Sequence, residues 1–210
     1  MFNEVVKDKT EIRDLIERWV VYRDAFLWDE FRKVWHDDGV MIATWSQSSF
    51  EEFIANTESG KKNHNLWYMH ILGGSGIEVN GDRAKSITKM IITQRITFDG
   101  VECDMHNFAR HFDFWERRDG RWGLVRRETI CDKDQLIPVY PGEVPNLDRS
   151  ILDKYPEEYR YLAYGIVYNG YPCSTDVPRY SGKGDPNSTL EKLYAKGDAW
   201  LNGELENPNK

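Results

Sequence analysis

Three two-residue turn signals divide the middle of this chain into four long segments with strand character. Each signal pairs Asn or Asp with Gly, residues that readily adopt the positive φ angles of a tight hairpin. The signals are Asn80-Gly81, Asp99-Gly100 and Asp119-Gly120. The segments that they separate lie at about 67–79, 83–98, 101–117 and 121–131. Strands joined by tight hairpins pair antiparallel, so the pattern predicts a four-stranded meander whose long strands bend at bulges, one of them near residues 73–76.

Helical patterns precede the meander. Asp8, with Glu11 three residues later, is typical of a helix N-cap, and the apolar residues that follow recur at helical spacing. We expect a second helix at about 28–36, a short strand at 40–45 and a third helix after the capping pattern Ser49-x-x-Glu52. Helices followed by a meander indicate an α+β fold. A curved antiparallel sheet with three N-terminal helices across one mouth would form a cone with an interior pocket.

The distribution of proline marks a boundary in the chain. All 8 prolines lie at or beyond Pro138. We therefore expect residues 1–137 to form one regular domain and residues 138–210 to form a Pro/Tyr-rich extension that packs on it as a lid or a subunit interface. This long C-terminal tail carries two helical patterns, one at about 156–169 and one that opens at Ser188-x-x-Glu191.

Charge and composition argue against several classes of protein. The formal net charge of −7 is unfavourable for binding nucleic-acid phosphates. No apolar run approaches the ~18 residues of a membrane-spanning helix, and the first residues show no secretory signal. We therefore expect a cytoplasmic protein without a nucleic-acid or membrane partner. The 3 cysteines are far apart, the 5 histidines do not converge, and phosphate-binding glycine motifs are absent, so neither a metal nor a cofactor is expected.

Three further stretches carry a recognisable pattern: residues 12–24, residues 34–38, and Tyr68 and His70 with the hairpin that follows them. Together they resemble the nuclear-transport-factor-2-like superfamily in its SnoaL-like enzyme branch. Residues 12–24 look like the first helix of scytalone dehydratase and hexachlorocyclohexane dehydrochlorinase, and residues 34–38 look like the end of the second helix. His70, two residues after Tyr68 and followed by the 77–84 hairpin, is similar to the family's histidine strand. The resemblance covers about the first 132 residues and implies the cone-shaped fold of that superfamily.

The resemblance also implies a catalytic pair. In those enzymes an aspartate on the first helix and a histidine on this strand form a dyad, and the matching positions here are Asp24 and His70. One position differs from scytalone dehydratase. That enzyme has a tyrosine directly before its aspartate, whereas Arg23 occupies this place here and Tyr22 lies one residue earlier.

The residues themselves give a physical reason for such a pair. Tyr68 and His70 share one face of their strand. A histidine buried among aromatic side chains has a lowered pKa unless a carboxylate pairs with it, and Asp24 would orient His70 while His70 moves the proton. The alternative is that the helix ends early, with Asp24 in solvent and His70 an ordinary half-buried histidine. Asp104 and His106, which share a face, then remain as a fallback pair.

Further side chains are candidates for contacts with substrate. Arg110 lies among phenylalanines on its strand, so it either binds a phenolate or carboxylate inside the cone or covers the outer face of the sheet. Arg126 and Arg127 point to opposite faces, and one of them should point inward. The predicted substrate-binding residues are Arg23, Tyr68, Trp28, Phe53, Arg110 and Arg127.

Together these features predict a cofactor-independent lyase that acts on a bulky aromatic small molecule. The reaction would be a dehydration or a dehydration-coupled C–C cleavage, with Asp24, His70 and Tyr22 as catalytic residues. Some lyases of the superfamily act on lignin-derived dimers, which makes these one substrate class. Two alternatives stay open, an isomerase or cyclase that uses the same dyad and a non-catalytic ligand-binding or assembly subunit. The resemblance also implies a homo-oligomer, either a trimer or a dimer.

Overall fold

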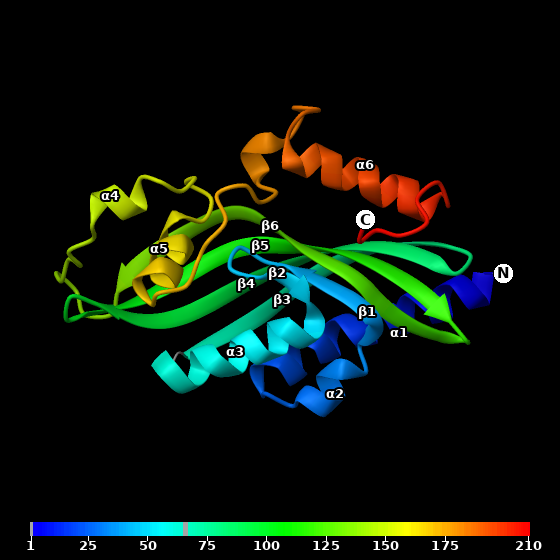
Figure 1. Cartoon of the computed structure of the whole chain (residues 1–210), viewed down its shortest axis with the longest axis horizontal. Coiled ribbons are helices and arrows are strands. Elements are labelled where there is room, and N and C mark those ends of the chain that lie inside the picture. Colours follow the sequence, from blue (N-terminus) through cyan, green and yellow to red (C-terminus); the bar gives the residue numbers. More distant parts are fainter. Residues whose placement is uncertain (1, 65–66) are drawn as a thin grey trace.

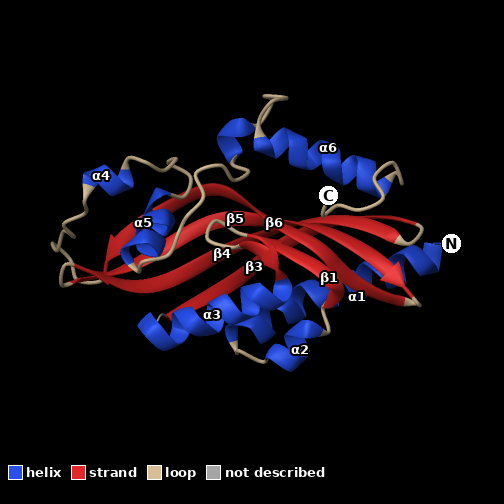
Figure 2. Ribbon diagram, in the orientation of Figure 1, coloured by secondary structure: helices blue, strands red, loops and turns tan. Residues whose placement is uncertain are grey.

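Four of the six strands in the described part of the chain form the predicted antiparallel meander. The computed structural model describes residues 2–64 and 67–210, and Figures 1 and 2 show its sheet between layers of helices. The strands are β1 (Trp35–Ile42), β2 (Gln47–Ser49), β3 (Trp67–Asn80), β4 (Arg83–Phe98), β5 (Val101–Arg118) and β6 (Arg121–Pro138). Their order in the sheet is β2-β1-β6-β5-β4-β3. At the hairpins Asp99 and Asp119 adopt φ values of 48° and 50°, as the turn signals require.

The other edge of the sheet differs from the prediction. β1 runs parallel to β6, and β2 pairs antiparallel with β1, so the sheet is mixed at this edge. The helix expected at 28–36 is the shorter α2 (Trp28–Arg32), and β1 starts at Trp35. Tertiary contacts cause this early start of β1. Val34 and Trp35 are buried in the core, and the Val34 carbonyl accepts a hydrogen bond from the Leu124 N–H of β6.

Two N-terminal helices cover part of one face of the sheet. α1 (Phe2–Asp24) begins before Asp8, so the predicted N-cap at Asp8 is wrong. The Asp8 carboxylate is buried and accepts hydrogen bonds from Arg117 at 2.8 Å and Trp122 at 3.0 Å. α3 (Phe50–His64) does follow the predicted capping box, because the Ser49 hydroxyl and the Glu52 carboxylate exchange hydrogen bonds with each other's backbone N–H.

Bulges occur where long strands need to bend. The pairing of β3 with β4 shifts between Leu72 and Ser75, at the predicted glycine-rich site. The pairing of β5 with β6 shifts twice, beside Ala109 and beside Trp115. These irregularities curve the sheet. We call the face that carries His70 the inner face; it packs against α1 and α3.

The C-terminal tail covers both faces of the sheet. Its helices are α4 (Arg149–Leu152), α5 (Arg160–Tyr168) and α6 (Thr189–Leu201). α5 starts four residues later than predicted, because the Asp134 carboxylate accepts hydrogen bonds from the backbone N–H groups of Tyr161 and Leu162 and fixes the first turn there. α6 opens at the predicted cap, where the Ser188 hydroxyl accepts from the Glu191 N–H.

α5 and α6 bury different parts of the sheet. Leu162 of α5 packs with Met105 on the inner face, beyond the area covered by α1 and α3. Trp200 of α6 packs with Phe112 and Phe114 on the outer face, and Figure 1 shows α6 across the sheet from α1 and α3. The protein is therefore an α+β fold with a curved sheet, N-terminal helices and a helical tail.

Candidate functional site

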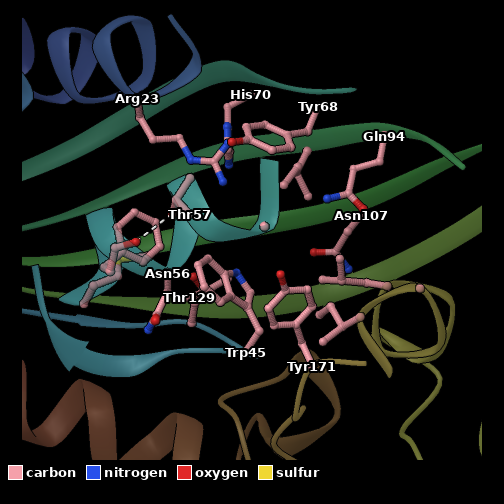
Figure 3. A pocket seen from close by; sticks show the side chains of 18 of the residues that line it. Arg23, Trp45, Asn56, Thr57, Tyr68, His70, Gln94, Asn107, Thr129 and Tyr171 are labelled. Carbon is pink, nitrogen blue, oxygen red and sulfur yellow. Dashed lines mark hydrogen bonds between the residues drawn. The ribbon is translucent and has the colours of Figure 1, made fainter. Parts of the chain in front are cut away.

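A cavity of about 120 Å³ lies between the inner face of the sheet and the helices. A single water needs ~10–15 Å³, so the cavity is large enough for a ring-sized ligand. Its wall is formed by residues of α1, α3, the inner faces of β1 and β3–β6, and the tail from Leu162 to Tyr171. Figure 3 shows polar side chains at several places around this wall, with Arg23, His70 and Tyr68 close together and Gln94 beside Asn107.

Asp24 and His70 are in direct contact at one end of the cavity. Asp24 is the last residue of α1, and its Oδ1 lies 2.7 Å from His70 Nδ1. Its Oδ2 accepts a hydrogen bond of 2.7 Å from the His70 backbone N–H. One carboxylate thus fixes both the ring and the main chain of its partner. A carboxylate can only accept a hydrogen bond, so the neutral His70 ring carries its proton on Nδ1 and donates it to Asp24. Nε2 is then the nitrogen left for a ligand.

Burial decides the charge of this pair. It lowers the pKa of His70 to about 4, helped by the positive charge of Arg23 and opposed by Asp24. Burial alone would raise the pKa of Asp24, but the hydrogen bonds and charge of His70 and the charge of Arg23 hold it below its usual value. At neutral pH the pair is therefore a carboxylate beside a neutral imidazole, which is the form of a general base.

Arg23 and Tyr68 form the polar wall next to His70. The Arg23 guanidinium lies 3.9 Å above the Tyr68 ring and contacts Asp24 Oδ1 at 3.2 Å through Nη1. Arg23 is only 4% exposed, and its Nε and the Tyr68 hydroxyl have no hydrogen-bond partner among the described residues. Burial raises the pKa of Tyr68, so its phenol keeps its proton. Unused donors beside His70 can hold an oxygen atom of a ligand.

A second polar area lies further across the inner face. Asn107 and His111 of β5 line the cavity together with Gln94 and Thr129. His111 is buried and packs edge-on against Trp19, with ring centroids 5.2 Å apart. Burial, followed by the charge of Arg127, holds its pKa well below the usual value. The alternation of residues along β5 indicates two faces of the strand. The sequence alone could not show that the face with Asn107 and His111 is the inner one.

Several predicted site residues do line the cavity, and others support it from behind. Phe53 is part of the wall, as are Arg23 and Tyr68. Tyr22 and Trp28 do not line the cavity and instead pack against the surrounding apolar core. The predictions of a catalytic role for Tyr22 and a substrate contact for Trp28 are therefore corrected, because their side chains face the core.

The two predicted arginines of β5 and β6 need corrections as well. Arg127 does point inward, but it is fully buried in an ion pair with Asp113, at 2.6 Å, and lies under the Trp19 ring rather than at the cavity. Arg110 faces outward, where it binds Asp132 and the Tyr194 hydroxyl of α6. Neither position provides contact with a ligand in this cavity.

The fallback pair also lies outside the cavity. Asp104 forms a two-pronged ion pair with Arg95, both contacts measuring 2.8 Å, and His106 is not part of the cavity wall. Within residues 2–64 and 67–210, His, Cys, Asp and Glu side chains do not gather in groups of three that could hold a metal ion. Over the same residues, each helix is too short or too polar to cross a bilayer.

Comparisons with known proteins identify the family of this chain. The family described as "SnoaL-like domain" matches residues 4–128. Pea pathogenicity protein 2 of Fusarium vanettenii is 33% identical over 207 residues, which are 94% of this chain and 87% of that protein.

Two solved structures share the fold at low sequence identity. A hexachlorocyclohexane dehydrochlorinase of Novosphingobium barchaimii is 15% identical with a TM-score of 0.55, over 70% of this chain and 99% of the other. A candidate scytalone dehydratase of Novosphingobium aromaticivorans is also 15% identical, with a TM-score of 0.53 over 70% and 96% of the two chains.

Proposed function

We propose that this chain, which belongs to the SnoaL-like domain family, is a cofactor-independent lyase that removes water from a bulky aromatic small molecule. One observation carries the proposal. Asp24 holds His70 through Nδ1 at 2.7 Å, so that a neutral imidazole stands at the wall of an apolar cavity. A desolvated imidazole with a fixed tautomer is suited to proton transfer.

The positions of these groups support the following reaction. His70 Nε2 removes a proton from a substrate carbon next to the carbon that bears a hydroxyl group. The electron pair of the C–H bond forms a C=C bond while the C–O bond breaks, and the imidazolium returns its proton to the departing hydroxyl as water. Asp24 stabilises the transient imidazolium. Arg23 and Tyr68 hold a neighbouring substrate oxygen on which negative charge develops, and the apolar walls strengthen these interactions.

The test is a mass balance on purified protein. Hydroxylated aromatic ketones and diols, including lignin-type dimers, are incubated with wild type, and the products are analysed by mass spectrometry. Loss of one water is expected, or loss of water with a one-carbon unit if C–C cleavage follows. His70→Gln should abolish turnover. His106→Gln, the same substitution outside the cavity, should leave turnover unchanged.

Two other outcomes would replace the proposal. A product of unchanged mass that depends on His70 would indicate an isomerase or cyclase. Tight binding of the compounds without any conversion, equal in wild type and His70→Gln, would indicate a non-catalytic binding protein.

A further inference from the structure

Asn107 is a polar group that the proposed reaction does not use. It lies on β5, is fully buried and lines the cavity. Its Nδ2 donates to the backbone carbonyls of Glu158, at 3.1 Å, and Lys133, at 3.5 Å. Only the amide NH₂ group can bind a carbonyl oxygen, so these contacts fix the orientation of the side chain.

This orientation leaves a buried acceptor at the cavity. Asn107 Oδ1 has no hydrogen-bond partner in the described part of the chain, and Figure 3 shows the oxygen on the side of Asn107 that faces the other cavity residues. A buried polar atom without a partner is destabilising, typically by more than the hydrogen bond would contribute. A ligand that brings an O–H donor to this place would satisfy it.

The sheet sets the distance from this acceptor to His70. In the strand pairing, His70 lies opposite Ile92, and Ile92 lies opposite Asn107. Residues directly opposite each other share a face, and neighbouring strands are ~4.8 Å apart, so the two positions are about 10 Å apart on the same wall. The cavity surface between and above them is apolar, with Ile92 below and Leu162 and Ile166 of α5 contributing. Such a surface accommodates a flat ring.

We propose that Asn107 is a specificity residue that accepts a hydrogen bond from a phenolic hydroxyl group of the substrate. The reacting carbon then lies at His70, at the other end of the ring, a placement that rests on the proposed function. Rings whose hydroxyl is replaced by an ether or a carboxylate are rejected, because they bring a lone pair instead of a proton to the Asn107 oxygen. A site built to bind a hydroxyl discriminates strongly against analogues that lack the proton.

The tail takes part in this recognition. The Glu158 carbonyl lies just before α5, and it holds the amide so that the oxygen remains the free end. Asn107 thus binds the tail with one end and the ligand with the other.

The experiment uses the full-length protein and two probes, phenol and its methyl ether anisole, in NMR-detected binding titrations. Wild type should bind phenol about tenfold more tightly than anisole. Asn107→Leu, which has a similar shape without the acceptor, should bind the two probes equally and lose about tenfold in affinity for phenol. Equal binding of the probes to wild type, no binding of phenol to wild type, or a phenol preference that survives in Asn107→Leu would overturn the proposal.

Two control variants separate recognition from folding and catalysis. Tyr159 is the neighbour of Glu158 in the chain, and its hydroxyl donates a hydrogen bond to the Ser174 carbonyl. Tyr159→Phe removes this tail hydrogen bond and should keep the phenol preference. His70→Gln should also keep it, since binding needs no turnover; a lost preference there would place the hydroxyl at His70 and overturn the proposal. If Asn107→Leu does not fold, a structure of wild type with phenol decides, because the phenol oxygen must lie within hydrogen-bond distance of Asn107 Oδ1.

Discussion

A histidine that stays neutral at physiological pH is the main chemical consequence of how Asp24, Arg23 and His70 are packed. Asp24 favours the protonated imidazole, whereas burial and the Arg23 charge oppose it, and the outcome is a pKa of about 4 for His70. The carboxylate therefore fixes the ring without charging it. This combination allows His70 to accept a proton over the whole neutral range.

The pH dependence of turnover follows from this charge state. His70 is the active base above its pKa, so kcat/KM should be nearly constant from pH 8 down to about pH 5.5 and fall only as the pH approaches about 4. Initial rates over this range, on the substrate found by mass spectrometry, provide the measurement. An ordinary histidine base would instead lose half of its activity near pH 6.5, and that result would contradict the assigned pKa.

Replacing Asp24 tests the orientation of the ring. In Asp24→Asn the amide can donate to Nδ1, so the proton is expected to move to Nε2, the atom that should accept from the substrate. Turnover should fall by about 10²–10⁴-fold, the usual contribution of a positioned general base. Glu78→Gln, which neutralises an exposed acid on the same strand as His70, serves as the control and should retain wild-type rates.

At the scale of elements, a fully buried ion pair between Asp113 and Arg127 links β5 to β6. Both side chains are fully buried, and the guanidinium contacts the carboxylate at 2.6 and 2.8 Å. A buried pair contributes little beyond what apolar residues could, but a single charge left behind is very unfavourable. Arg127 also lies 4.4 Å from the Trp19 ring, so the pair supports α1 as well.

Replacing one partner of this ion pair should therefore destabilise the protein much more than replacing both partners by apolar residues. Arg127→Met alone is expected to lower the free energy of unfolding by about 3–5 kcal/mol, because Asp113 stays buried without its partner. The double variant Arg127→Met/Asp113→Leu should regain most of that loss. Urea unfolding of both variants measures the difference, and equal destabilisation of the single and double variants would refute this reading of the pair.

Local signals predicted the elements well and their edges poorly. The Asp-Gly turns, the bulge near Gly73 and the caps at Ser49 and Ser188 depend on neighbouring residues, so the sequence contains all that is needed to recognise them. The start of β1 at Trp35 depends on pairing with β6, almost 90 residues later in the chain. No local pattern carries that information, and the helical spacing of residues 28–36 was therefore extended too far.

The same distinction applies to the site. Asp24 and His70 could be placed together because a resemblance supplied their long-range pairing, and the structure confirms their contact. The free oxygen of Asn107 could not be foreseen, since it depends on a tail carbonyl 51 residues away. The two alternating faces of β5 were visible, but only the packing of α6 on Phe112 identifies the outer one.

At the scale of the whole molecule, several buried titratable groups link the fold to pH. His70 and His111 have lowered pKa values, so between pH 6.5 and about 4 the unfolded chain binds protons that the native protein does not. Their contribution therefore makes stability fall as the pH falls through this window. Asp134 acts in the opposite direction, because burial raises its pKa to about 6 and the native state binds its proton first.

Chemical unfolding at two pH values tests this balance. Each histidine contributes at most about 1.4 kcal/mol per pH unit, so the free energy of unfolding should be lower at pH 5 than at pH 7 by about 2–3 kcal/mol after the Asp134 offset. His111→Gln should remove about 2 kcal/mol of that difference, which is most of it, because the Asp134 offset remains. Stability that is equal or higher at pH 5 would show that the buried histidines do not control the acid response.

The most direct measurement of the central claim is a ¹⁵N NMR titration of the His70 ring in the full-length protein. A neutral ring is expected at pH 7, with the proton on Nδ1, a bare Nε2 and a midpoint near 4. In Asp24→Asn the proton should move to Nε2. A midpoint at or above 6.5, or a proton on Nε2 of the wild type at pH 7, would contradict the claim that Asp24 presents His70 to the cavity as a neutral base.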